Sequence, residues 1–110
     1  MNSLASRMEA ELRRGTVQLV ALTLLETPRY GYDLVRLLAN AGFEVEEGTL
    51  YPILRRMEQQ GVLESTWNTE GSRPRKYYRL SDDGASHKAA LVAAWCRVRD
   101  ATDAALKDSA

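Results

Sequence analysis

The spacing of apolar residues changes once along this chain, and that change limits the folds it can adopt. Before Gly61, apolar residues recur at intervals of three and four, a pattern that predicts helices. These helices cover about 4–26, 32–41 and 47–60. After Gly61, two short runs rich in β-branched and aromatic residues predict strands over about 62–67 and 76–80, with turn residues between them. We therefore expect a mainly α fold with one small β-hairpin.

The third predicted helix has two different faces. At 100° per residue, Leu50, Ile53, Leu54 and Met57 share one side, which is expected to point inward. The opposite side carries hydrogen-bond donors and cations but little apolar bulk. Its candidates for contact with a partner are Thr49, Tyr51, Arg55 and Arg56.

Positive charge is concentrated in the middle of the chain. The whole chain has 15 basic and 15 acidic residues, but residues 55–80 contain six basic residues and only three acidic ones. Four of these basic residues lie on the hairpin, Arg73, Arg75, Lys76 and Arg79, and the first three are the candidates for contact with phosphates. A basic hairpin directly after a polar-faced helix is typical of a winged helix-turn-helix, and such a patch on a neutral body fits contact with phosphates.

A long helix is predicted from Ser81, a plausible N-cap, to about Lys107. Because the compact core is complete at Leu80, the apolar stripe on this helix needs another surface to cover it, and a second subunit is the natural candidate. The stripe consists of Leu91, Val92, Trp95, Val98, Thr102 and Leu106. We therefore expect a winged helix-turn-helix DNA-binding domain over 1–80, with its first helix also contributing to the dimer, and a dimerisation helix over 81–110.

Several classes of protein are disfavoured. With one cysteine, Cys96, and one histidine, His87, a single chain can build neither a disulfide nor a Cys/His metal site. These two residues lie about 13 Å apart on one helix, too far for a catalytic pair. No triad or phosphate loop is present, so we expect no enzyme and no cofactor. Without a membrane-length apolar stretch or a signal peptide, we expect a cytoplasmic protein.

Three motifs together resemble one known family. They are YGYDL at 30–34, EGTLYPILRRME at 47–58 and RPRKYYRLS at 73–81. In this order and spacing they are similar to the PadR family of bacterial transcriptional regulators, and the short C-terminal region is similar to the LmrR-like subfamily with a single dimerisation helix. The resemblance implies that 47–58 contains the recognition helix and 73–80 the wing. Relatives often have Ser-Pro where this chain has Glu46 and Glu47.

The resemblance also suggests a ligand site. Trp95 matches a tryptophan that stacks on planar drugs at the dimer interface of multidrug-responsive relatives, and Met8 and Leu12 are candidates to complete that cavity. The alternative is that Trp95 only packs the interface.

The expected function is sequence-specific binding of double-stranded DNA by a homodimer that represses transcription at a pseudo-palindromic operator. A small planar or aromatic effector would release it. In this scheme Arg55 reads a base edge, while Thr49 and Tyr51 donate to phosphates. The alternative is a winged-helix module that binds an acidic protein surface, supported by the neutral net charge and by Glu44, Glu46 and Glu47 beside the third helix.

Overall fold

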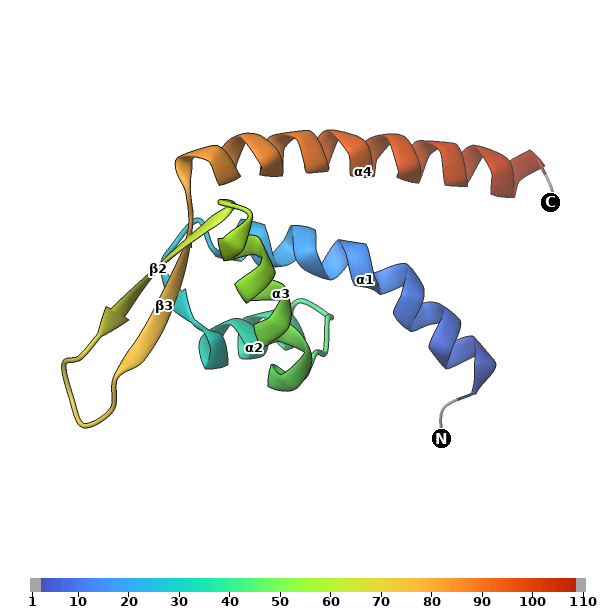
Figure 1. Ribbon diagram of the computed structural model, residues 1–110. Coiled ribbons are helices and arrows are strands. Elements are labelled where there is room, and N and C mark those ends of the chain that lie inside the picture. Colours follow the sequence, from blue (N-terminus) through green and yellow to red (C-terminus); the bar gives the residue numbers. More distant parts are fainter. Residues whose placement is uncertain (1–2, 109–110) are drawn as a thin grey trace.

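The computed structural model of this protein describes residues 3–108 and contains four helices and three strands within that range (Figure 1). They are α1 (Leu4–Leu24), β1 (Arg29–Tyr30), α2 (Gly31–Asn40), α3 (Glu47–Gln59), β2 (Leu63–Asn68), β3 (Arg75–Leu80) and α4 (Asp82–Asp108). The predicted mainly helical fold with a β-hairpin is confirmed. Residues 1–2 of the predicted DNA-binding domain and residues 109–110 of the predicted dimerisation helix lie outside the described residues.

The helix boundaries follow from local chemistry. The side chain of Ser3 accepts a hydrogen bond from the backbone N–H of Ser6 and so caps α1. α2 and α3 are each followed by a glycine with positive φ, Gly42 at 96° and Gly61 at 81°. Glycine adopts this conformation at little steric cost, so the chain can reverse direction there.

The sheet has three antiparallel strands in the order β1-β3-β2. β2 and β3 form the expected hairpin, in a register that runs from Leu63 opposite Leu80 to Asn68 opposite Arg75. The short strand β1 on the other edge of β3 was not predicted. It spans only two residues, too few to show a period of two in the sequence. The strand is formed by pairing with β3, in which Tyr30 lies opposite Tyr77.

The hydrophobic core lies between α1, α2, α3 and the sheet. It is built mainly from leucines on the inward faces of the three helices, closed by Leu63 of β2 and Tyr78 of β3. The fully buried side chains of largest volume are Leu25, Leu34, Leu38, Leu50 and Leu54. This core fixes how α3 is presented on the surface of the body.

Ser81 joins this body to α4. Its side chain accepts a hydrogen bond from the backbone N–H of Gly84 (2.9 Å), and its backbone N–H donates to the carbonyl of Val62 (3.0 Å). Ser81 therefore acts as the predicted N-cap and fixes the first turn of α4 to the start of β2.

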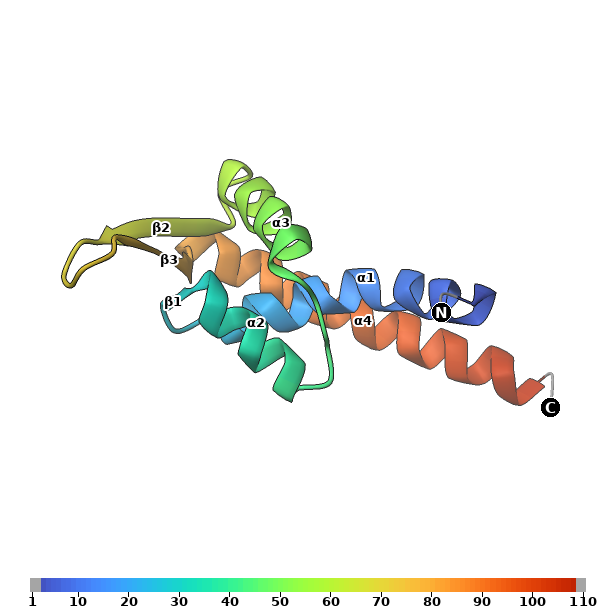
Figure 2. The same cartoon turned by 90° about the horizontal axis from the view of Figure 1, so that it is seen from below.

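α4 runs along α1 and extends beyond the body (Figures 1 and 2). Gly84 is the one buried residue of this 27-residue helix. The radius of gyration is 16.1 Å, above the roughly 13 Å expected for a compact chain of this length. Within residues 3–108, no helix is long and apolar enough to cross a membrane.

Candidate nucleic-acid interface

The two faces of α3 differ as the sequence predicts. Leu50, Leu54 and Met57 are buried in the core, and Ile53 is half-buried at the edge of the helix nearer α1. The outward face is exposed and consists of Gly48, Pro52, Arg55, Arg56 and Gln59. The N-terminal end of α3 points away from α4, and the hairpin projects from the same body (Figure 1).

Arg55 and Arg73 are exposed cations whose side chains form no ion pair or hydrogen bond with any other residue in the described range 3–108. Arg56 is also exposed, but its guanidinium donates to the side-chain oxygen of Gln18 on α1 at 3.4 Å. A charge that already has an internal partner gives up that contact when it binds elsewhere. Arg55 and Arg73 are therefore the most available anion-binding groups of the predicted set.

Tyr51 is half-buried between α3 and the start of α2. A Cβ atom added to Gly31 would lie 2.4 Å from a carbon of the Tyr51 ring, so only glycine leaves room for the ring there. Burial raises the pKa of Tyr51, with smaller contributions from Glu47 and Tyr78. The hydroxyl is therefore protonated at neutral pH and can donate a hydrogen bond.

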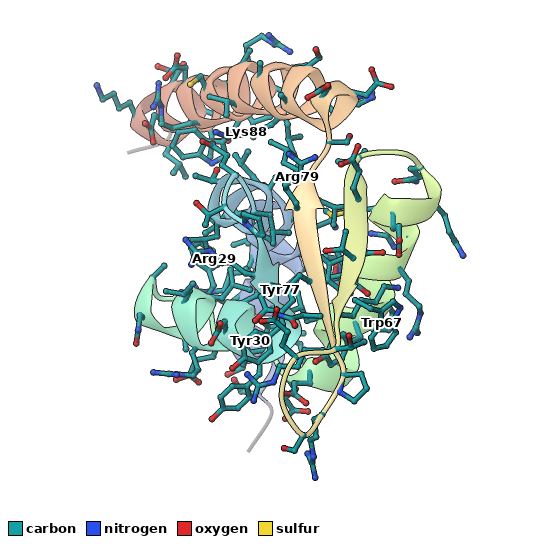
Figure 3. All side chains as sticks on the ribbon, turned by 90° about the vertical axis from the view of Figure 1, so that its left-hand side faces the viewer. Arg29, Tyr30, Trp67, Tyr77, Arg79 and Lys88 are labelled. Atoms are coloured by element: carbon teal, nitrogen blue, oxygen red, sulfur yellow. The ribbon has the colours of Figure 1, made fainter. Side chains whose placement is uncertain are left out.

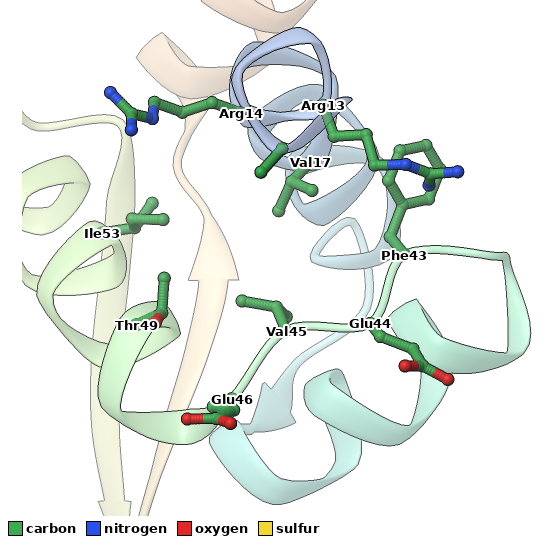
Figure 4. A pocket seen from close by; sticks show the side chains of 10 residues that line it. Arg13, Arg14, Val17, Phe43, Glu44, Val45, Glu46, Thr49 and Ile53 are labelled. Atoms are coloured by element: carbon green, nitrogen blue, oxygen red, sulfur yellow. The ribbon is translucent and has the colours of Figure 1, made fainter. Parts of the chain in front are cut away.

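Thr49 is exposed and lies on the edge of α3 that faces α1. It lines a cavity of about 380 Å³ together with Val17, Phe43 and Ile53 (Figure 4). At one side of this cavity, Arg13 stacks on Phe43 and donates to the carbonyl of Gly42 at 2.7 Å. This position differs from the outward face of α3, where Arg55 lies.

On the hairpin, Arg75 is fixed by aromatic residues. Its guanidinium lies 4.7 Å from the centre of the Tyr30 ring, and Tyr30 makes an edge-to-face contact with Tyr77 at 5.5 Å. Both tyrosines come from paired strands, so the short strand β1 supports the position of Arg75. The sequence contained no signal for this role of β1.

Lys76, unlike Arg73, has an internal partner. Its ammonium group forms a salt bridge of 3.1 Å with Glu58 of α3 and lies over the ring of Tyr78. Glu58 also accepts a hydrogen bond from the hydroxyl of Ser65 on β2. This Glu58–Ser65–Lys76 network, defined by these three residues, connects α3 to both strands of the wing.

The network shifts two pKa values. The hydrogen bond from Ser65 and the contact with Lys76 lower the pKa of Glu58, and the hydrogen bond to Glu58 raises the pKa of Lys76. Both groups are therefore charged over the whole neutral range. The network holds the wing against α3 by charge-assisted hydrogen bonds, which are stronger than neutral ones.

We expect Glu58→Gln to lower the free energy of unfolding by about 1 kcal/mol at neutral pH. A carboxyl whose pKa is lowered on folding stabilises the protein above its unfolded pKa, about 4.3, and this stability is lost as pH falls through the lower folded value. The difference between the two proteins should therefore shrink below about pH 4. Urea unfolding at several pH values measures it.

Glu64→Gln is the matched control, because Glu64 pairs with Arg79 at an exposed site where ion pairs contribute little. An effect of Glu58→Gln that is the same at every pH, or no larger than that of the control, would show that the network does not hold the wing.

A second cavity of about 310 Å³ lies between α1 and α4. Leu12 and Trp95, two of the three predicted ligand-site residues, both line it. Met8, the third, is exposed on α1 and is not among the lining residues. Trp95 is 40% exposed, and the guanidinium of Arg99 lies 4.9 Å from the centre of its ring.

The predicted dimerisation residues lie along one side of α4. Five of the six are large apolar side chains that remain exposed in the single chain, and Thr102 is exposed between them, with its hydroxyl bonded to the carbonyl of Val98. The five are Leu91, Val92, Trp95, Val98 and Leu106. Leu4, Met8 and Leu12 of α1 are exposed as well.

Comparison with known proteins agrees with this geometry. The model of the transcriptional regulator PadR-like family matches residues 20–90. The crystal structure of a PadR family transcriptional regulator from Eggerthella lenta is 45% identical, covers 94% of this chain and 92% of its own, and superposes with a TM-score of 0.90.

A PadR-like transcriptional regulator from Bacillus cereus is 26% identical, with coverage of 87% of this chain and 96% of its own and a TM-score of 0.75. A transcriptional regulator from Mycobacterium tuberculosis is 35% identical over 75 residues, which are 67% of this chain and 70% of that protein. The family and these relatives are regulators of transcription and not enzymes. This chain therefore belongs to the PadR-like family and is a DNA-binding transcriptional regulator.

Proposed function

We propose that the protein represses transcription as a homodimer bound to a pseudo-palindromic operator. The α3 helix of each copy enters a major groove, and the two wings hold the flanking backbone. The observation that carries this proposal is the combination of a buried inner face of α3 with an unpaired, exposed Arg55 on its outer face. An arginine in this position fits bidentate binding to a guanine edge.

The other predicted DNA contacts take different roles in this proposal. Arg73 and Arg75 contact phosphates from the wing, and Tyr51 donates its hydroxyl to a phosphate beside the major groove. Thr49 and Arg56, on the side of α3 nearer α1, contact the phosphates at that edge of the groove. Lys76, whose charge is paired with Glu58, acts mainly by fixing the wing.

The dimer is proposed from the apolar surface that α1 and α4 leave uncovered. Leu12 is 81% exposed and Val98 is 64% exposed, which is unusual for a contiguous set of apolar residues on a monomer. A second copy provides the same stripe on its own α4, so a two-fold interface covers both stripes at once. Residues of α4 would thereby set the distance between the two α3 helices.

The effector is proposed to be a small planar or aromatic molecule that binds at this interface. The cavity beside Leu12 and Trp95 is of the size that such ligands occupy, and its lining is mostly apolar. An effector releases the operator only if it binds better to a dimer geometry that no longer matches the grooves. Trp95 would stack on it.

We expect a planar cationic dye, proflavine, to quench the Trp95 emission of a Trp67→Phe variant, in which Trp95 is the remaining tryptophan of the two in the chain. Trp95→Ala should weaken dye binding, followed by dye anisotropy, by about tenfold, and Trp95→Phe, which keeps a ring, should weaken it less. Equal dye affinity in wild type, Trp95→Ala and Trp95→Phe would exclude stacking on Trp95.

The second candidate function is a winged-helix module that binds proteins. Glu44 and Glu46 favour it, because both are exposed and have no ion pair within the described residues. The salt dependence of binding to a DNA duplex separates the two functions. Neutralising several phosphates makes the affinity fall steeply and linearly on a log–log plot, whereas a protein-binding module would show weak binding at every salt concentration.

A further inference from the structure

Trp67 is a large aromatic residue on the wing that the structure leaves uncovered. Its side chain is 65% exposed, and it has no hydrogen bond or ring contact with the rest of the chain between residues 3 and 108. Tryptophan usually buries its apolar area and pairs its ring N–H. Neither requirement is met by the described residues of one copy. The proposed dimer surface lies on α1 and α4, whereas Trp67 lies on β2, so that surface does not include Trp67.

The strand register places Trp67 on the side of the hairpin that faces α3. Successive residues of a strand point to opposite faces, so the pairs Leu63–Leu80, Ser65–Tyr78 and Trp67–Lys76 share one face. Near the base of the hairpin this face packs against α3, where Ser65 bonds to Glu58. Trp67 lies one pair further toward the tip, and Figure 3 shows it on the α3 side of the hairpin.

Contacts with α3 support this position. Lys76, directly opposite Trp67 in the register, is fixed by its salt bridge to Glu58, and Ser65, two residues before Trp67, is fixed by the same carboxylate. The Glu58–Ser65–Lys76 network therefore positions the strand that carries Trp67 relative to α3. A strand that is already positioned loses less backbone entropy when it binds than a free loop would.

The surroundings of Trp67 indicate the chemistry of its partner. Arg73, at the turn of the same hairpin, is an exposed cation without an ion pair in the described residues, so an anionic partner is favoured there. An indole offers a flat apolar surface and one N–H donor. The backbone of DNA offers both counterparts, an apolar deoxyribose and an adjacent anionic phosphate.

We propose that Trp67 contacts the DNA backbone strand that passes between α3 and the wing, with its indole packed on a deoxyribose and its Nε1–H donating to a phosphate. The inference rests on the proposed binding of DNA by α3 and the wing. The contact is independent of base sequence, so it positions the protein on any duplex without reading it.

The first test measures binding to sheared genomic DNA at low salt, by anisotropy of labelled protein, for wild type and Trp67→Thr. Threonine keeps the β propensity of the strand but removes the ring. We expect about tenfold weaker binding. The salt dependence should keep its slope, because an apolar contact releases few counter-ions, whereas Arg73→Gln should reduce that slope by about 1.

The second test uses fluorescence. In Trp95→Phe, Trp67 is the remaining tryptophan, and its emission should change on DNA addition with the same midpoint as the anisotropy. The matched Trp67→Phe protein, which retains Trp95, should show a much smaller emission change at that midpoint. Circular dichroism checks that the variants fold, which we expect because Trp67 and Trp95 are both exposed.

The outcomes separate this inference from the proposed function. Wild-type protein that does not bind DNA at all contradicts the proposed function itself. Normal DNA binding by wild type, together with unchanged affinity of Trp67→Thr and silent Trp67 emission, overturns the contact of Trp67 and leaves the function of α3 and the wing intact.

Discussion

Replacing Gly84 by alanine is expected to lower the free energy of unfolding by about 3 kcal/mol, an effect at the upper end of those seen on overpacking a buried site. An added Cβ would lie 2.1 Å from the carbonyl oxygen of Val62 and 2.9 Å from a methyl carbon of Leu80. The carbonyl cannot move away easily, because it accepts hydrogen bonds from the backbone and the side chain of Ser81.

The expected loss exceeds the gain from helix propensity, since alanine is about 1 kcal/mol better than glycine inside a helix. Gly48→Ala is the matched control, because a Cβ added there would meet no atom within 4 Å beyond the neighbouring backbone of its own helix. This control should change stability by about 1 kcal/mol or less. Urea unfolding at equal protein concentration measures both variants. If Gly84→Ala is as stable as wild type, the junction between Ser81 and α4 is not the tight contact described above.

Val98→Glu is expected to convert the dimer into monomers and to weaken operator binding by at least about a hundredfold. Val98 is 64% exposed in the single chain, at the rim of the cavity between α1 and α4, so glutamate should disturb the fold of one copy only slightly. In the proposed dimer, two such carboxylates per interface would lose water without a partner, which is strongly unfavourable. Each monomer then binds only one half-site.

Ala93→Glu is the matched control for charge. Ala93 is an exposed residue of α4 about half a turn away from the apolar stripe, so this variant should remain dimeric and bind normally. Sedimentation equilibrium gives the oligomeric state, and DNA anisotropy gives the affinity. A Val98→Glu protein that stays dimeric would place the dimer interface elsewhere than on the stripe of α4.

Much of the fold could be predicted because each long element has a strong periodic signal. In α3, for example, the three- and four-residue spacing of Leu50, Leu54 and Met57 determines which side is buried, and the structure confirms it. Gly42 and Gly61 likewise predict the ends of α2 and α3. In the structure both adopt positive φ just after these helices. Such features depend only on neighbours in the sequence.

The features that sequence analysis missed depend on contacts between distant residues. β1 has two residues and exists only through pairing with β3. Lys76 and Arg73 carry the same charge in the sequence, but of these two only Lys76 forms an ion pair with Glu58, 18 positions away. The exposure of Trp67 was also missed, because the sequence does not say where α3 stops covering the hairpin.

In the proposed dimer, the two α3 helices together bind a two-fold site in DNA. The most direct test incubates the purified protein with fragmented genomic DNA at near-physiological salt and sequences the fragments it retains. We predict enrichment of a palindrome whose half-sites are about one helical turn, roughly 34 Å, apart. Retention of fragments without any common sequence, by folded and dimeric protein, would contradict the claim and favour the protein-binding module.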